Sequence, residues 1–159
     1  REIEGIAAEF AARRATEADR ALLTRIITSM KAAHKKDDFE EEAGIDVEFH
    51  NAIGECAHNI ILLHTLRSCY RLLAEGVFYN RALVYNLPGA RDQLLMQHVA
   101  IYDAVMAANP DAARRAAQAH IDFVSRACQS CGCNSVHLIC QRAARHPNNP
   151  KRRRQSDVE

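Results

Sequence analysis

The apolar residues of positions 1–127 recur at steps of three and four, which is the spacing of one face of an α-helix. Ala, Leu, Glu and Arg dominate this stretch, and no β-branched alternating run bounded by turn residues interrupts it. The pattern therefore predicts an all-α fold, an antiparallel bundle of about six helices joined by short loops. The expected helices are Arg1 to Ala15, Thr16 to about Lys35, Phe39 to Ala57, Ile60 to Asn80, Ala90 to Ala108, and Asn109 through at least Val124. The inward face of the first one is expected to be Ile3, Ile6, Ala7, Phe10 and Ala11.

Residues at the junctions between these segments are typical of helix caps. Thr16, followed three residues later by Asp19, resembles a capping box, and Asn109 precedes a proline that suits a first helical turn. Asn59 is placed to cap the fourth segment, and Leu83 to Gly89, which ends in Pro-Gly, is expected to form a bend. The junctions favour sharp reversals between neighbouring helices.

The composition fits one ordinary globular domain. Hydrophobic residues make up 48% of the 159 residues and charged residues 26%, which is too apolar for a disordered chain. No apolar run approaches the roughly 20 residues that cross a bilayer, and the first residues hold no basic-then-apolar leader. Cys56 and Cys69 each stand alone inside a helical pattern, so the six cysteines do not indicate a disulfide scaffold. We expect a cytoplasmic protein with no membrane partner.

Charge is distributed unevenly along the chain. Residues 1–124 hold 14 Lys and Arg against 18 Asp and Glu, whereas residues 125–159 hold seven against two. An acidic body is a poor surface for tracking phosphate groups. Nucleic-acid binding by this chain alone would therefore depend on its last 35 residues.

Four polar residues fall on faces that the helical period turns inward. Asp46 and His50 are four apart on one predicted helix, so both side chains project to the same side. His98 and His120 each lie mid-helix on an apolar stripe. An exposed hydrogen-bonded pair and two ordinary core histidines are the alternative interpretation. Four unpaired polar groups in one small core would cost a few kcal/mol each, and a shared metal ion removes that cost.

Three neutral imidazoles and one carboxylate suit a divalent transition metal with open coordination positions. Zinc is the first choice, with nickel, manganese or iron as alternatives. A di-iron bundle would need Glu-x-x-His on two helices, and that motif occurs once, at Glu55 to His58. Three other histidines have no partner at metal spacing and are expected to be surface or capping residues: His34, His58 and His64.

The same residues carry a resemblance to a known family. The spacing runs four residues from Asp46 to His50, 48 to His98 and 22 more to His120. This pattern resembles the all-helical, metal-binding, FadR-type C-terminal effector domain (FCD) of GntR-family transcription regulators, over residues 1 to about 124. Within the family it is most similar to regulators of lactate-utilisation and glycolate operons. The stretches that carry this are Ala57-His-Asn-Ile-Ile-Leu-Leu, Gly76-Val-Phe, Gln97-His-Val-Ala-Ile-Tyr-Asp-Ala-Val, and Ala116 to His120.

The resemblance implies a ligand-binding and dimerising domain and not an enzyme. In the family a winged helix-turn-helix precedes this domain and contacts operator DNA, and nothing in this chain matches it. A small 2-hydroxy acid such as lactate or glycolate would chelate the metal through its carboxylate and neighbouring oxygen. The resemblance places Arg1 near such an effector. Tyr102 and Asn59 are further candidate contacts, although a core position and a helix cap are their alternatives.

The last 35 residues depart from the family pattern. Residues 125–159 form an atypical tail rich in Cys and Arg, including Cys128, Cys131 and Cys133. A zinc knuckle and a nucleic-acid patch at Lys151 to Arg154 are alternatives that match no common template. A metal-dependent enzyme acting on hydroxy acids and a structural dimerisation module are the alternative functions for the whole chain.

Overall fold

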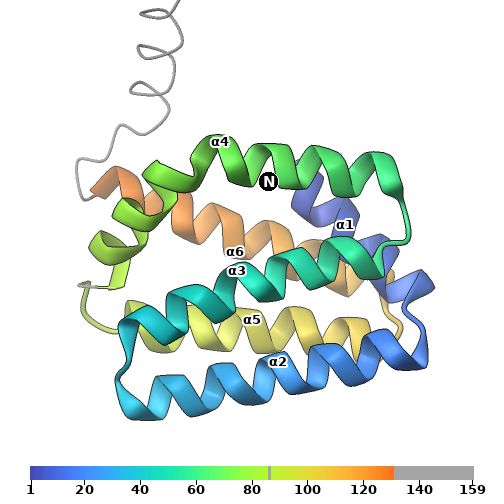
Figure 1. Cartoon of the computed structure of the whole chain (residues 1–159), viewed down its shortest axis with the longest axis horizontal. Helices are drawn as coiled ribbons and strands as arrows, with labels where there is room; N and C mark the ends of the chain where they lie inside the picture. Colours follow the sequence, from blue (N-terminus) through green and yellow to red (C-terminus); the bar gives the residue numbers. More distant parts are fainter. Residues whose placement is uncertain (86, 131–159) are drawn as a thin grey trace, which may run out of the picture.

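The computed structural model describes residues 1–85 and 87–130, and for residues 71–83 and 130 it describes the backbone only. This part of the chain folds into six helices and no strand, which confirms the predicted all-α class (Figure 1). None of the described helices is long and apolar enough to cross a membrane. The helices are α1 (Glu2–Arg14), α2 (Glu17–Lys36), α3 (Phe39–Cys56), α4 (Ile60–Tyr85), α5 (Ala90–Met106) and α6 (Pro110–Ser130).

The central helix of the bundle is α3. It packs against α1, α2 and α4, while α5 packs against α2, α6 and α1 (Figure 1). Helices that follow one another along the chain from α2 to α6 run in alternating directions, as short loops between them require (Figure 1). One side of α3 therefore faces α5 and α6 across the interior, where the polar residues of these helices meet.

The helix ends form as the junction residues predict. The Thr16 side chain accepts a hydrogen bond from the backbone N–H of Asp19, and the Asp19 carboxylate accepts one from the backbone N–H of Thr16, which is a complete capping box. The side chain of Asn109 accepts from the backbone N–H of Ala112 at 3.1 Å, directly before Pro110. These caps fix where α2 and α6 begin.

The inward face of α1 differs from the one expected. Of the expected residues, Ala7 and Ala11 are buried, whereas Ile3, Ile6 and Phe10 are only partly buried. The buried residues of α1 are Glu4, Gly5, Ala7, Ala8, Ala11 and Ala12. The small residues let α1 lie close against α6, where a Cβ on Gly5 would come within 2.8 Å of Gln118 Cγ. Glu4 lies one turn before Ala7 and Ala8 on the face that these small residues form, so it is buried with them.

The end of α4 also differs from the prediction. The helix continues to Tyr85, so the expected end at Asn80 is wrong and the bend starts later than Leu83. The sequence between Asn80 and Tyr85 contains neither Gly nor Pro, so nothing in it ends the helix. Pro88 is the first residue that disfavours helix continuation. Gly89 then takes a left-handed backbone (φ 71°) that favours glycine, and α5 begins at the next residue.

The sixth helix reaches Ser130, so the prediction that it runs through at least Val124 is confirmed. Of the candidate knuckle residues, Cys128 lies on this helix and is buried. The others, Cys131 and Cys133, and the basic stretch from Lys151 to Arg154 lie outside the described residues.

Candidate metal centre

Three helices bring four polar side chains together in the middle of the bundle. Asp46 and His50 come from α3, His98 from α5 and His120 from α6. All four are buried, with between 2% and 5% of each residue exposed. One ligand atom of each lies within 4.8 Å of the others, so the group could hold a metal ion. The sequence predicts that these four residues share one site, and in the structure they lie together.

The distances within this group fit a shared ion. Nε2 of His98 lies 3.3 Å from Nε2 of His50 and 3.0 Å from Oδ1 of Asp46. The second Nε2, that of His50, is 3.9 Å from the same Asp46 oxygen. Two nitrogens bound at typical zinc distances to a tetrahedral ion lie about 3.4 Å apart, which matches the two histidines. Nitrogen and carboxylate donors also suit this class of metal.

Local helix geometry explains why these side chains converge. Asp46 and His50 are one turn apart, so they share the face of α3 that looks into the bundle. His98 follows buried Leu94 by one turn on α5, and His120 follows buried Ala117 by nearly one turn on α6. The apolar neighbours on these two helices drive burial, and the histidines are buried with them.

Aromatic packing restricts the rings of the cluster. The edge of Phe49, which is fully buried, packs against His98 with the ring centroids 5.2 Å apart. The rings of His50 and His120 stack at 5.1 Å between centroids. Such contacts limit ring rotation, so the donor nitrogens are held in place before any ligand binds.

Two carbonyl or carboxylate oxygens contact the outward nitrogens of the histidines. Gln97 Oε1 lies 3.1 Å from Nδ1 of His120, and Glu4 Oε2 lies 3.5 Å from Nδ1 of His50. Tyr70 donates its hydroxyl hydrogen bond to the other oxygen of Glu4. Such outer contacts usually select which ring nitrogen carries the proton. Glu4 and Tyr70 were not predicted from the sequence, because nothing in their own segments shows which residues they face.

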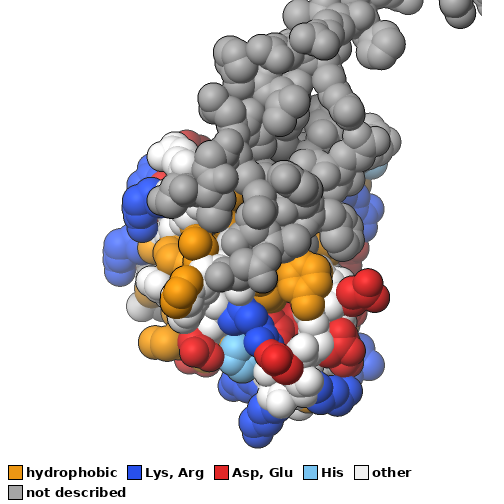
Figure 2. Space-filling view, turned by 90° about the vertical axis from the view of Figure 1, so that its left-hand side faces the viewer, with side chains coloured by type: hydrophobic (Ala, Val, Ile, Leu, Met, Phe, Trp, Pro, Cys, Tyr) orange, Lys and Arg blue, Asp and Glu red, His pale blue; other side chains and the backbone are white. Residues whose placement is uncertain are grey.

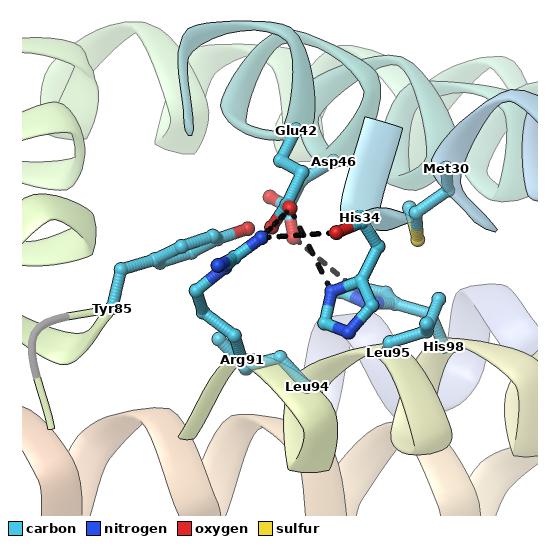
Figure 3. A pocket seen from close by; sticks show the side chains of 9 residues that line it. All are labelled: Met30, His34, Glu42, Asp46, Tyr85, Arg91, Leu94, Leu95 and His98. Carbon is cyan, nitrogen blue, oxygen red and sulfur yellow. Dashed lines mark hydrogen bonds and ion pairs between the residues drawn. The ribbon is translucent and has the colours of Figure 1, made fainter. Parts of the chain in front are cut away.

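A pocket adjoins the cluster and opens at the end of the bundle where α5 begins. It is lined by two of the four polar residues, Asp46 and His98, and by residues of α2 to α5 (Figure 3). The other lining residues are Met30, His34, Glu42, Tyr85, Arg91, Leu94 and Leu95. Figure 2, which faces this end of the molecule, shows basic, acidic and histidine side chains gathered below the apolar surface.

The side chain of Arg91 places its guanidinium group in this pocket. It forms a forked ion pair with Glu42 and donates to the carbonyl of His34 at 3.3 Å (Figure 3). It also contacts Asp37. The pKa of Glu42 lies above its ordinary value because the carboxyl group is buried, and the facing imidazole of His34 offsets only part of this effect. The pocket therefore holds cationic and anionic groups side by side close to the metal cluster.

His34 differs from the sequence expectation. It was expected to be a surface or capping residue, but its side chain is only 20% exposed and lies in the pocket between Glu42 and Asp92. Of the other two histidines, His64 is exposed, and His58 bonds the Asp19 carboxylate at 2.7 Å. The position of His34 depends on residues from α3 and α5, which its own helix does not reveal.

The three predicted effector contacts have other partners in the structure. Arg1 bonds Asp122 at 2.9 Å and also contacts Glu2 on the surface. The Tyr102 hydroxyl lies 3.0 Å from Thr24 Oγ1. Asn59 accepts from the backbone N–H of Leu62 at 3.1 Å, as a helix cap does. Effector contact by Arg1, Tyr102 and Asn59 stays a prediction.

Comparisons with known proteins agree with this architecture. The model of the FCD domain family matches residues 1–123. A regulatory protein named for the L-lactate dehydrogenase operon of Escherichia coli K12 is 40% identical over 123 residues, covering 77% of this chain and 46% of the relative. The Glc operon transcriptional activator of the same strain is 35% identical over 140 residues, covering 86% and 55%. The chain spans about half the length of these curated relatives.

A solved structure shows the same fold at lower sequence identity. Escherichia coli McbR/YncC superposes with a TM-score of 0.64 over 79% of this chain and 63% of that chain, at 19% identity. At that identity the likeness concerns the fold alone. The two sequence relatives are named as an operon regulator and a transcriptional activator, and neither is named as an enzyme.

Proposed function

Because the chain belongs to the FCD domain family, we propose that it is the effector-binding and dimerisation domain of a GntR-family transcriptional regulator. The domain senses a small carboxylate, a 2-hydroxy acid such as lactate or glycolate, through a bound divalent metal. Operator DNA is contacted through a separate domain, and the regulator acts in the cytoplasm as a homodimer.

One observation carries the metal-dependent part of this proposal. Three imidazoles and a carboxylate from three helices converge in a buried group whose donor atoms all lie within 4.8 Å of one another. Asp46, His50, His98 and His120 are the residues that would hold the ion. Zinc suits this donor set best, with nickel, manganese and iron as alternatives. A bound ion supplies a Lewis-acid position for an oxygen ligand.

The adjoining pocket supports a small anionic ligand. Two of the metal-binding side chains line one wall, so a ligand in the pocket can reach the centre. The Arg91 guanidinium, which pairs with Glu42 and Asp37 in this structure, would exchange these partners for the carboxylate of the ligand, and Leu94 and Leu95 provide apolar walls beside it. A relative named for the L-lactate dehydrogenase operon is consistent with a 2-hydroxy acid.

A thermal-shift titration tests the proposal. The metal-loaded domain is titrated with glycolate, L-lactate, D-lactate and pyruvate, before and after treatment with EDTA. A ligand that binds only the folded state raises the melting temperature, and we expect one acid to do so only when metal is present. The response should vanish in His98→Ala and persist in His64→Ala, which alters an exposed histidine outside the cluster.

The outcomes separate the parts of the proposal. Protein that binds no divalent metal at micromolar concentration would refute the metal-dependent function. Metal binding without any response to the four acids would leave the metal as a structural element and refute the 2-hydroxy acid assignment.

A further inference from the structure

We propose that Glu4 of α1 is a positioning residue for the metal ligand His50, and that Tyr70 of α4 holds Glu4 in place. The carboxylate keeps the proton of His50 on Nδ1, so that the lone pair of Nε2 faces the cluster. This inference rests on the proposed metal-binding function. It adds a residue from the first helix to a centre whose predicted ligands come from α3, α5 and α6.

The burial of Glu4 indicates a specific role. The residue is 8% exposed and sits on the face of α1 that packs into the bundle. Burying a carboxylate is costly unless donors compensate it. Two groups do so among the described side chains: the Tyr70 hydroxyl donates to Oε1, and Nδ1 of His50 lies 3.5 Å from Oε2.

The two nitrogens of His50 face opposite directions. Its Nε2 lies 3.3 Å from Nε2 of His98 and 3.9 Å from the Asp46 carboxylate, on the cluster side of the ring. Nδ1 faces Glu4. A neutral imidazole carries one proton, and only its unprotonated nitrogen can bind a metal. An acceptor at Nδ1 therefore selects the tautomer that leaves Nε2 available.

A second histidine of the cluster has the same arrangement. Nδ1 of His120 lies 3.1 Å from Oε1 of Gln97, an oxygen that can only accept. An oxygen on the outer nitrogen is thus present at two cluster histidines, supplied by different helices. Glu4 differs from Gln97 because its side chain is a carboxyl group, whose two oxygens contact two different residues, Tyr70 and His50.

Metal affinity in matched variants tests the role of Glu4. Glu4→Leu keeps most of the side-chain volume and removes the acceptor, and we expect the metal dissociation constant to rise about 10- to 100-fold. Glu4→Gln keeps an accepting oxygen and should recover most of that loss. Glu9→Gln is the control, because Glu9 lies on the same helix but pairs with Arg13 and Arg114 on the surface.

A spectroscopic measurement distinguishes positioning from simple packing. The ¹⁵N chemical shifts of His50 in the metal-free protein report which nitrogen is protonated. We expect the Nδ1–H form in the parent chain and in Glu4→Gln, and a shift towards the Nε2–H form in Glu4→Leu. Tyr70→Phe should change the affinity less than Glu4→Leu, because it removes one donor to Glu4 and leaves the carboxylate.

The possible outcomes are distinct. If the parent chain binds no metal, the proposed function fails. If the parent chain binds metal and Glu4→Leu binds it equally well with an unchanged His50 tautomer, the inference about Glu4 is wrong while the metal site stands. Circular dichroism of each variant shows whether a loss of affinity comes from unfolding, and Glu4→Gln provides the folded comparison if Glu4→Leu does not fold.

Discussion

Nε2 of His50 and Nε2 of His98 face each other at 3.3 Å across the interior between α3 and α5. Two lone pairs would repel at this distance, so either one of the two nitrogens carries a proton or both bind a cation. A proton on His98 that is donated to Asp46, 3.0 Å away, satisfies one of them. A divalent ion would bind both nitrogens and the carboxylate at once. The protonated centre and the metal-bound centre should respond differently to a chelator.

Chelation should destabilise the fold if an ion occupies the centre. A ligand at about 1,000 times its dissociation constant stabilises the native state by about 4 kcal/mol. For a domain of this size that corresponds to a fall in melting temperature on the order of 10 °C when EDTA removes the ion. Differential scanning calorimetry of the zinc-loaded protein, with and without chelator, measures the change.

The cluster variants provide the control for chelation. His98→Ala and His120→Ala lose a ligand, so their melting temperatures should not respond to EDTA. His64→Ala should respond like the parent chain, because this histidine is exposed and outside the cluster. A parent chain that shows no change on adding zinc or EDTA would favour a purely hydrogen-bonded core.

The four cluster residues could be predicted from sequence because each lies on a helix whose apolar neighbours fix the inward face. His98 follows Leu94 and precedes Ile101, so the helical period alone turns it inward. The spacing of Asp46 and His50 then adds a carboxylate and a second imidazole. Helical periodicity therefore predicts that each of the four side chains points inward, whereas their meeting at one point was an inference from the cost of burying them and from the family resemblance.

Glu4, His34 and Arg91 could not be predicted in this way. Their importance comes from residues on other helices, such as Tyr70 for Glu4 and Glu42 for Arg91. A charged residue usually lies at the surface, and the larger apolar residues of this helix predict a different inward face from the one that Glu4 shares with small alanines. Pairwise packing between helices is the information that a single sequence lacks.

The capping box of α2 should make stability sensitive to acid. Although burial of Asp19 acts to raise its pKa, hydrogen bonds from Thr16 and His58 outweigh this, and the pKa lies below its ordinary value of 3.8. A carboxyl whose folded-state pKa is depressed contributes stability that is present above the unfolded-state value and lost as the pH falls through the folded-state value. Asp19→Asn should therefore be less stable than the parent chain at pH 7.

Urea unfolding at two pH values measures this effect. The difference in urea midpoint between Asp19→Asn and the parent chain should be present at pH 7. It should shrink as the pH falls below 3.8 towards the lower folded-state pKa, where the parent carboxyl loses its charge. Asp111→Asn is the matched control, because Asp111 is also acidic and lies in the first turn of a helix. An equal effect of both substitutions would assign the stability to the helix dipole instead of the capping box.

Cys56 should be unreactive in the folded protein. Burial raises the pKa of its thiol to about 12, helped by the nearby carboxylates of Asp19 and Glu55. Because the thiolate is the reactive form, almost none is present at pH 8. Iodoacetamide should modify partly exposed Cys69 and spare Cys56 in native buffer, and should modify both in urea. Peptide mass spectrometry gives the two rates, and equal rates in native buffer would contradict the prediction.

Arg91 and Arg1 make different predictions for effector binding. The pocket beside the cluster contains the Arg91 guanidinium, whereas Arg1 bonds Asp122 on the surface. Family resemblance assigns the effector contact to Arg1, and the geometry of the pocket favours Arg91. Arg91→Lys keeps the charge beside buried Glu42 but loses the paired donors that match a carboxylate. We expect it to weaken the response to the 2-hydroxy acid by about tenfold or more, which corresponds to about 1.4 kcal/mol.

Isothermal titration of metal-loaded protein distinguishes the two arginines. Arg91→Lys should raise the dissociation constant of the acid and leave metal affinity unchanged, because Arg91 is not among the four metal-binding candidates. Arg1→Ala should have the smaller effect. The reverse order would show that Arg1 leaves Asp122 when the acid binds, as the family resemblance implies. In that case Arg91 acts only to neutralise Glu42. A double variant that carries Arg91→Met and Glu42→Gln should then bind the acid as tightly as the parent chain does.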